Sequence, residues 1–310
     1  MISLLKLIRP VNLIMLALTQ YFIDVFVLQP LFNKYGLIFT LTEFQFFLLV
    51  LSTGLICAAG YIINDYFDVK ADAINKPDEV IIGKSISPQN AFNWYLVLTG
   101  IGLALGIYLS IVAGNWKLVT VHIICIFLLF AYSSSFKKVA LLGNIIVALL
   151  IAISILMIGV FEPHLYNLAR EGDYYIANLC WNIIFGLSLF AFLLTMVREI
   201  VKVMEDVRGD KEINARTIPI IWGMQTAKGM AAFFILATIG SAIYFFNKLE
   251  TSSQNIYLVL LIVLIGLLLF TLFKLVSANQ KKQFAQLSFL LKICMLVGIC
   301  FLPLYYLLEF

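Results

Sequence analysis

Acidic residues are concentrated in one short stretch of an otherwise apolar chain, residues 64–72. On a helix, Asp65, Asp68 and Asp72 would lie at positions i, i+3 and i+7, and therefore on one face. Asn64 lies four residues before Asp68, so its side chain can join that face. Neighbouring carboxylates oppose one another's ionisation unless they share a cation, and carboxylate and amide oxygens suit Mg²⁺. The stretch predicts either a magnesium site or a solvated polar turn at a membrane edge.

A second acidic stretch follows another apolar run, at residues 198–210. Its polar residues fall at helical spacings i, i+3, i+7 and i+11, and we expect them to form one face: Glu199, Lys202, Asp206 and Asp210. Two acidic faces on separate helices could hold Mg²⁺ between them and present it to a diphosphate. Because metal ions and cations stabilise the charge of a departing diphosphate, the two stretches predict ionisation of an allylic diphosphate.

The two stretches resemble the paired motifs of the UbiA superfamily of intramembrane prenyltransferases. NDYFDVKAD at 64–72 is similar to the family's NDxxDxxxD motif, and EDVRGD at 205–210, followed by RTIP at 216–219, is similar to the second acidic motif. The resemblance extends over essentially the whole chain. It implies an all-α membrane protein whose helices enclose a central cavity, with Mg²⁺ binding the diphosphate of a polyprenyl donor and an acceptor capturing the prenyl group.

The resemblance also implies roles for individual residues. The expected metal ligands are side chains of the two motifs: Asn64, Asp68, Asp72, Asp206 and Asp210. Asp68 and Asp206 are expected to be catalytic as well as metal-binding. Asp65 either binds metal or holds its neighbours, and Glu199 has no certain role.

A diphosphate also needs cations, since metal ions leave some of its oxygens without partners in a low-dielectric site. Residues 9–12, RPVN, resemble an N-terminal pattern of the family, which implies that Arg9 and Asn12 bind diphosphate. Lys84 follows a glycine in the loop 73–90, which is long enough to cap a cavity, and Lys202 lies on the second acidic face. Each of these cations could instead anchor the chain at a membrane surface.

A third pattern, YSSSFKK at 132–138 followed by Gly143 and Asn144, resembles the end of the family's fourth helix. Tyr132 could stabilise an allylic cation and Lys137 could bind phosphate, although an interfacial Tyr with a Lys pair is common in membrane proteins. Two positions depart from the family: Val203 replaces an additional Asp and Asn214 a glycine.

Composition places the chain among polytopic membrane proteins. It has 310 residues, of which 63% are hydrophobic and 12% charged, and its mean hydropathy is +1.02. These values exclude an ordinary soluble domain. A net charge of +4 is modest, so we expect no nucleic-acid partner, and nothing indicates a protein partner. Five cysteines without metal-binding spacing are interpreted as core residues.

Apolar runs of about 17–25 residues predict nine membrane spans within a single domain over 1–310. They cover roughly 11–28, 44–63, 94–113, 117–133, 144–160, 181–197, 219–246, 256–275 and 286–308.

The distribution of Lys and Arg predicts the orientation of these spans. One side carries Lys6, Arg9, Lys70, Lys76, Lys84, Lys137, Lys138, Arg198, Lys202, Arg208, Lys211, Arg216, Lys281 and Lys282, and the other only Lys34, Lys117, Arg170 and Lys248. The positive-inside rule then predicts a cytoplasmic N-terminus in the cell (inner) membrane. Both acidic stretches fall on the cytoplasmic side, where Mg²⁺ and diphosphate would be supplied.

Within the superfamily, the motifs are most similar to the branch of geranylgeranylglycerol-phosphate geranylgeranyltransferases. We therefore expect Mg²⁺-dependent transfer of a polyprenyl group, geranylgeranyl by this resemblance, to a lipophilic acceptor such as a prenylglycerol phosphate in the lipid phase. One alternative is an aromatic prenyltransferase that acts on a quinone precursor, a chlorin or haem. A different class, a carboxylate-based transporter, would also place acidic groups in a membrane protein.

Overall fold

The computed structural model describes residues 2–165, 167, 174–248 and 254–310. Within these residues the chain is helical, and only isolated bridges, Ile82 with Ile86 and Val139 with Arg216, have β character. Among the described residues, nine segments are long and apolar enough to cross a membrane, which confirms the predicted all-α, multi-pass architecture. Arg170 lies outside the described residues.

The first span is built from α2 (Pro10–Ile23), the π-helical turn η1 (Asp24–Leu28) and α3 (Gln29–Tyr35). The other spans are single helices: α4 (Glu43–Asn75), α5 (Pro88–Val112), α6 (Val119–Ser134), α7 (Leu142–Val160), α9 (Tyr174–Glu205), α12 (Met224–Phe246), α13 (Gln254–Ser277) and α14 (Lys281–Glu309). The short helix α1 (Ile2–Leu7) precedes the first span, and other short elements lie between spans: η2 (Pro77–Glu79), η3 (Trp116–Leu118), η4 (Phe136–Lys138), α10 (Val207–Glu212) and α11 (Ile218–Ile221).

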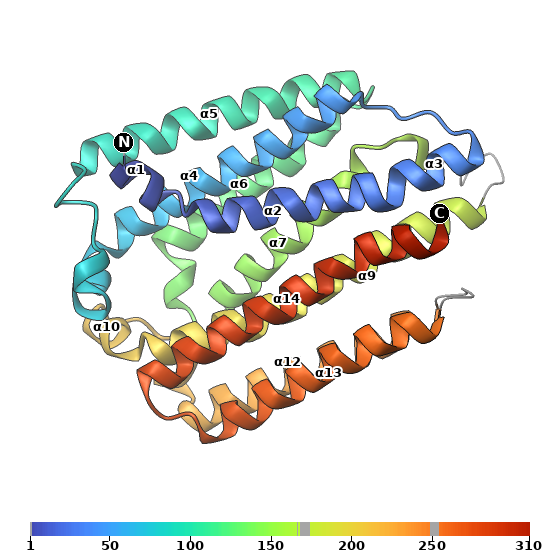
Figure 1. The fold of residues 1–310 in the computed structure, drawn as a ribbon. Helices are drawn as coiled ribbons and strands as arrows, with labels where there is room; N and C mark the ends of the chain where they lie inside the picture. Colours follow the sequence, from blue (N-terminus) through green and yellow to red (C-terminus); the bar gives the residue numbers. More distant parts are fainter. Residues whose placement is uncertain (1, 166, 168–173, 249–253) are drawn as a thin grey trace.

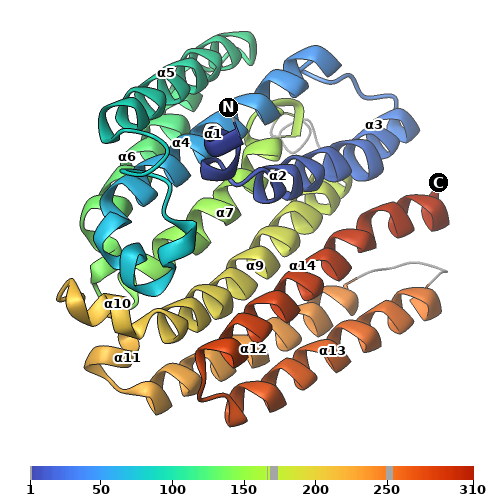
Figure 2. The same cartoon turned by 60° about the vertical axis from the view of Figure 1, so that its left-hand side comes forward.

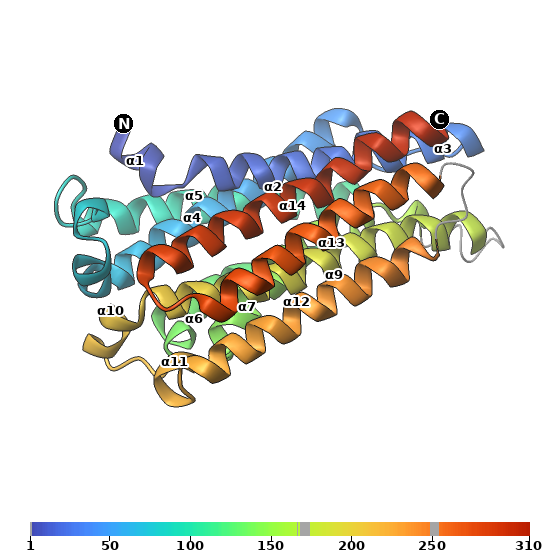
Figure 3. The same ribbon diagram turned by 60° about the horizontal axis from the view of Figure 1, so that its bottom comes forward.

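The long helices lie side by side in one bundle, with the two ends of the chain at opposite ends of it (Figure 1). Helix α9 runs through the middle of the bundle and packs against α7, α12 and α14, while α4 packs against α5 and α6 (Figures 2 and 3). The short elements α1, α10 and α11 gather at the end that holds the N-terminus. This end therefore carries both acidic stretches; which membrane face it occupies stays a prediction.

Small residues allow the helices around α4 to approach closely, as expected where lipid removes most of the hydrophobic force between helices. A Cβ added to Gly102 of α5 would lie 2.7 Å from the Cγ1 atom of Ile56 on α4. Ser52 of α4 donates a hydrogen bond of 2.8 Å to the carbonyl of Gly102. This contact holds α4 in place along the part that precedes the first acidic stretch.

The prediction of a single helical face for the second acidic stretch is wrong. Helix α9 ends at Glu205, and Asp206, with φ −98° and ψ 8°, precedes the separate helix α10. Asp210 thus lies on a different helix from Glu199. The predicted span 219–246 is also interrupted, because Gly223 at φ 86° separates α11 from α12. Glycine is the residue that adopts such a φ without steric cost.

Helix α10 turns away from α9 because it docks on the end of α4. The side chain of Asn75, the last residue of α4, donates from Nδ2 to the carbonyl of Asp206 at 3.1 Å. Its Oδ1 accepts from the N–H of Gly209 at 2.9 Å. A Cβ on Gly209 would lie 2.7 Å from Asn75 Cγ and 2.8 Å from the carbonyl oxygen of Ala71. The glycine within the second motif therefore permits the approach of the two acidic segments.

We expect Gly209→Ala to destabilise the protein, since the added methyl group would overlap Asn75 and the α4 backbone. Overpacking of this kind costs about 1–3 kcal/mol. The midpoint of thermal unfolding in detergent should fall below that of the wild-type protein. Gly240→Ala in α12 is the matched control, because its Cβ would meet no atom within 4 Å. Equal unfolding midpoints for the two variants would contradict this account of the α4–α10 contact.

Candidate active site

The first acidic stretch forms one wall of the site, because α4 continues without interruption from Glu43 to Asn75. Asp65, Asp68 and Asp72 therefore keep the predicted i, i+3, i+7 spacing, and their side chains are half-buried. Phe67 and Lys70 lie between them in sequence and are exposed on another face. The predicted clustering of these carboxylates on a helix is confirmed; their role as metal ligands stays a prediction.

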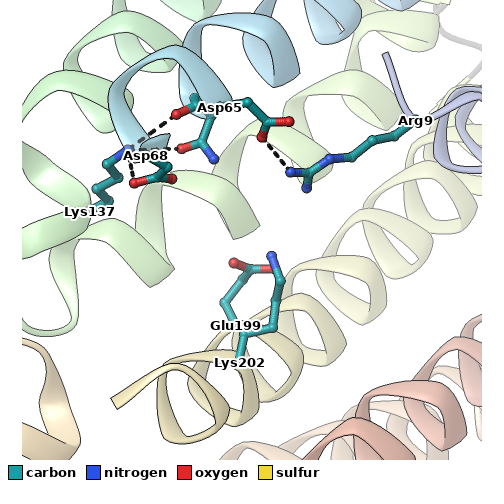
Figure 4. Close-up of polar contacts among 7 residues, drawn as sticks. Arg9, Asp65, Asp68, Lys137, Glu199 and Lys202 are labelled. Carbon is teal, nitrogen blue, oxygen red and sulfur yellow. Dashed lines mark hydrogen bonds and ion pairs between the residues drawn. The ribbon is translucent and has the colours of Figure 1, made fainter. Parts of the chain in front are cut away.

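Two cations from other segments contact this wall (Figure 4). Arg9 donates from Nη2 to Asp65 Oδ1 at 2.6 Å, and its guanidinium lies 5.0 Å from the centre of the Tyr61 ring. Lys137 Nζ lies 2.6 Å from Asp68 Oδ1 and 3.4 Å from Asn64 Oδ1. Asp65 thus pairs with Arg9, and its role toward metal or toward its neighbours in the motif stays a prediction.

Local backbone features deliver both cations. Arg9 caps the start of α2 with φ 53° and ψ 64°, a left-handed conformation that costs an L-residue about 1–2 kcal/mol. The Asp65 ion pair helps to hold this conformation. Lys137 belongs to η4, which packs closely on the first turn of α7. A Cβ added to Gly143 in that turn would lie only 2.8 Å from Lys137 Cα, so only glycine allows this approach. The glycine of the Gly143–Asn144 pattern thereby allows a close approach of two backbones.

The α9 part of the second acidic stretch forms the facing wall, whereas Asp206 and Asp210 lie beyond the end of α9, in the segment that rests on α4. Glu199 of α9 is only 5% exposed and accepts hydrogen bonds from Arg198 at 3.2 Å and Lys202 at 3.5 Å. Asp206 carries a buried Oδ1 atom with no hydrogen-bond partner among the described residues. Buried polar atoms are normally paired, so this oxygen is free to bind a cation.

Burial shifts the ionisation of the groups outside the spans. It raises the pKa of Asp210 to about 7, and the nearby Asp206 carboxylate adds to the shift. Burial opposes the charge of Arg9, but the nearby Asp65, Tyr61 and Asp72 together outweigh it and the pKa of Arg9 is raised. The pKa of Lys137 is lowered because burial exceeds the attraction of Asp68. The raised pKa of Asp210 indicates that the carboxylates of the second motif are poorly compensated without an added cation.

No three carboxylate, His or Cys side chains of residues 2–165, 167, 174–248 and 254–310 are placed as a ready metal site. Asp65 and Asp68 face Arg9 and Lys137 instead. The donors nevertheless fit Mg²⁺, because Asn75 holds the segment of Asp206 and Asp210 against the end of α4. The unpaired Oδ1 of Asp206 is the observation that favours a cation there.

A cavity of about 270 Å³ lies between α2, α4, α6, α7, α9 and α14 and confirms the expected central cavity. The residues of its polar part are Arg9, Asn12, Asn64, Tyr132, Arg198, Glu199, Lys202 and Lys292. Most of its remaining lining is apolar, including Leu16, Ile56, Leu129, Ile151 and Phe190. A cavity of this kind suits a ligand with a charged head and a long apolar chain.

The structure does not bring every predicted residue to this cavity. Asp68, Asp72, Asp206 and Asp210 lie at the end of the bundle, outside the cavity lining. Lys84 is exposed and donates to the carbonyl of Pro77 in its own loop at 2.9 Å, which gives no support to its predicted role in diphosphate binding.

Two residues of the site were missed by the sequence reasoning. Asn75 carried no signal, since it follows the first motif as an ordinary polar residue. Lys292 did carry a signal, because it is a charged residue inside the predicted span 286–308.

Asn214, where the family has glycine, adopts φ 55°, which asparagine tolerates better than most residues.

A model of the UbiA prenyltransferase family matches residues 31–294. A digeranylgeranylglyceryl phosphate synthase from Saccharolobus solfataricus is 37% identical over 75% of this chain and 73% of its own length. A solved structure of a digeranylgeranylglyceryl phosphate synthase has a TM-score of 0.67 at 23% identity, covering 98% of this chain and 97% of that one. A UbiA homologue from Archaeoglobus fulgidus, bound to GPP and Mg²⁺, has a TM-score of 0.62 at 16% identity, covering 97% and 99%.

Proposed function

The chain belongs to the UbiA prenyltransferase family, and on that premise we propose that it transfers a geranylgeranyl group from its diphosphate to the hydroxyl of a prenylglyceryl phosphate. The observation that carries the proposal is the cavity, apolar along most of its wall and charged beside the two acidic motifs. The chain is a multi-pass membrane prenyltransferase, so the transporter alternative is set aside. An aromatic acceptor remains as a possible outcome of the experiment below.

The reaction exchanges one C–O bond for another. The bond between prenyl C1 and the diphosphate oxygen breaks, and its electron pair stays on the diphosphate. The acceptor hydroxyl oxygen then forms an ether bond to C1, and its proton passes to the released diphosphate. Bound between Asp68 and Asp72 on α4 and Asp206 and Asp210 beside it, Mg²⁺ would supply stabilisation of the leaving-group charge.

Arg9 and Lys137 are positioned to take part in this step. Each is paired with a carboxylate in the structure, and each could also donate hydrogen bonds to the oxygens of a bound diphosphate. The two cations then neutralise charge that metal leaves exposed. The ion pairs thus hold these cations and carboxylates in position before substrate binds.

Tyr132 and the apolar lining would act on the prenyl group. Tyr132 lines the cavity at its polar part, where its ring can stabilise positive charge that develops at C1. The apolar side chains would exclude water, which would otherwise capture the allylic cation and release prenyl alcohol. Asn12 and Asn64 line the same part and are available as hydrogen-bond partners.

The location of the site is also a proposal. The end of the bundle that carries the motifs is the end at which most Lys and Arg residues outside the spans lie. By the positive-inside rule this end faces the cytoplasm, in the cell membrane.

The experiment that tests the function measures diphosphate release by the purified protein in detergent with geranylgeranyl diphosphate and Mg²⁺. A prenylglyceryl phosphate, hydroxybenzoate, naphthoate and haem serve as acceptors. We expect release that depends on the glyceryl phosphate acceptor and stops on chelation of Mg²⁺. Release with an aromatic acceptor alone would establish the alternative, and no release by folded protein with any acceptor would refute transfer.

Replacement of a metal-binding carboxylate should remove activity. Asp68→Ala and Asp206→Ala are each expected to lower turnover by about two orders of magnitude or more, the scale seen when a group that stabilises transition-state charge is removed. Glu79→Gln, an exposed acidic position in η2, is the matched control and should keep full activity. Wild-type turnover in either aspartate variant, at normal yield, would contradict the two-motif mechanism.

Arg9→Ala should weaken binding of the donor, because a charge-assisted hydrogen bond to diphosphate is worth about 1.5–3 kcal/mol. We expect the donor KM to rise roughly tenfold or more, with the acceptor KM unchanged. Lys6→Ala, a neighbouring exposed cation on α1, is the control. A donor KM equal to that of the control would leave Arg9 with only the anchoring role.

A further inference from the structure

Three cations, Arg198, Lys202 and Lys292, line the same cavity as a single carboxylate, Glu199. Arg198 and Lys202, one turn apart on α9, both contact Glu199. Lys292 lines the same cavity from α14 and forms no hydrogen bond or ion pair with any residue that the structure describes. The Nε atom of Arg198 is buried and has no hydrogen-bond partner among the described residues. The group therefore has a surplus of two positive charges.

The position of Lys292 makes this surplus costly. At a rise of 1.5 Å per residue, Lys292 lies about 16 Å along α14 from Lys281, well inside a membrane span. Charged side chains at such depth face a partner or a polar cavity and mark ligand sites. A Lys without a partner in a cavity that already holds Arg198 and Lys202 therefore calls for an anionic ligand.

The opposite wall has the reverse balance. Arg9 and Lys137 are each matched by one carboxylate, Asp65 and Asp68. Asp72 has no ion pair with any described residue, nor have Asp206 and Asp210. Excess carboxylate suits an anion that arrives with metal ions, as a diphosphate does. Excess cation suits an anion that binds directly, so the two walls are built for two different anionic groups.

We propose that Arg198, Lys202 and Lys292 bind the phosphate group of the acceptor. A phosphate monoester carries about 1.5 to 2 negative charges near pH 7 and offers three acceptor oxygens. It matches the surplus of this cluster, whereas the single charge of an aromatic carboxylate does not. The inference rests on the proposed function and gives Lys202 a different ligand from the diphosphate that the sequence suggested.

The geometry places such a phosphate opposite the donor. Glu199 and Lys202 project from α9 toward the side of the gap where Arg9 and Asp65 meet (Figure 4). A phosphate held by α9 and α14 would leave the hydroxyl of the same small glyceryl unit within the gap, next to the prenyl carbon of the donor. Glu199 then acts as a positioning residue that holds Arg198 and Lys202 toward the cavity before the acceptor binds.

The test uses the full chain in detergent and the variants Lys292→Met and Lys292→Arg. Steady-state kinetics are measured with geranylgeranylglyceryl phosphate and with the corresponding glycerol ether that lacks phosphate. We expect Lys292→Met to raise the KM of the phosphorylated acceptor about ten- to hundredfold, and to leave the donor KM and the KM of the unphosphorylated acceptor unchanged. Lys292→Arg should restore most of the loss, and Lys274→Met, an exposed lysine of α13, should behave as wild type.

A binding measurement keeps the inference independent of turnover. Thermal unfolding is followed with each acceptor in the absence of donor; the phosphorylated lipid should stabilise wild-type protein but not Lys292→Met, and the phosphate-free lipid should stabilise neither selectively. A raised donor KM in Lys292→Met, or equal losses with both acceptors, would overturn the assignment. If wild-type protein transfers to no glyceryl acceptor but binds the phosphorylated one through Lys292, the proposed function fails and the phosphate site stands.

Discussion

The compensation of charge at the edge of an apolar bundle is the constraint on which the site depends. Carboxylates so close together in a low-dielectric setting must be paired or bind a cation. Asp65 and Asp68 are paired with Arg9 and Lys137, whereas one oxygen of Asp206 has no partner within the described chain. Under the proposed function, these ion pairs would be exchanged for contacts with metal and diphosphate, so the charges that the reaction would need are already in place without substrate.

The positions of these charges depend on two close backbone approaches. Gly209 lets α10 rest on Asn75 and the end of α4, and Gly143 lets the segment of Lys137 rest on α7. Neither glycine carries chemistry, yet each brings a charged residue of another segment to the first motif. The left-handed Arg9 serves the same purpose at the start of α2. Loops are thus fixed on rigid helices by a small number of tight contacts.

The cavity has an apolar part and a charged part. Its apolar length fits a prenyl chain, and its charged part adjoins both motifs. Beside the cavity, the end of α4 and the segment that rests on it carry more carboxylates than cations, whereas the cavity wall formed by α9 and α14 carries more cations than carboxylates. This asymmetry is well suited to a reaction in which two anionic lipids meet but only one of them has to lose its anionic group. A transporter would need no such difference between the walls.

The sequence by itself determined the class of protein, the number of spans and the first motif. Long apolar runs have only one way to satisfy their backbone in lipid, and the spacing of Asp65, Asp68 and Asp72 survives because α4 continues through it. The second motif could not be placed in this way. Its helical face fails at Asp206 because a tertiary contact, Asn75 with Gly209, outweighs the continuation of α9. The pairing of Lys137 with Asp68, the exposure of Lys84 and the meeting of Lys292 with Arg198 in one cavity join residues distant in sequence. Only the packing of the helices decided them, since local spacing carries no information about which faces of separate helices come together.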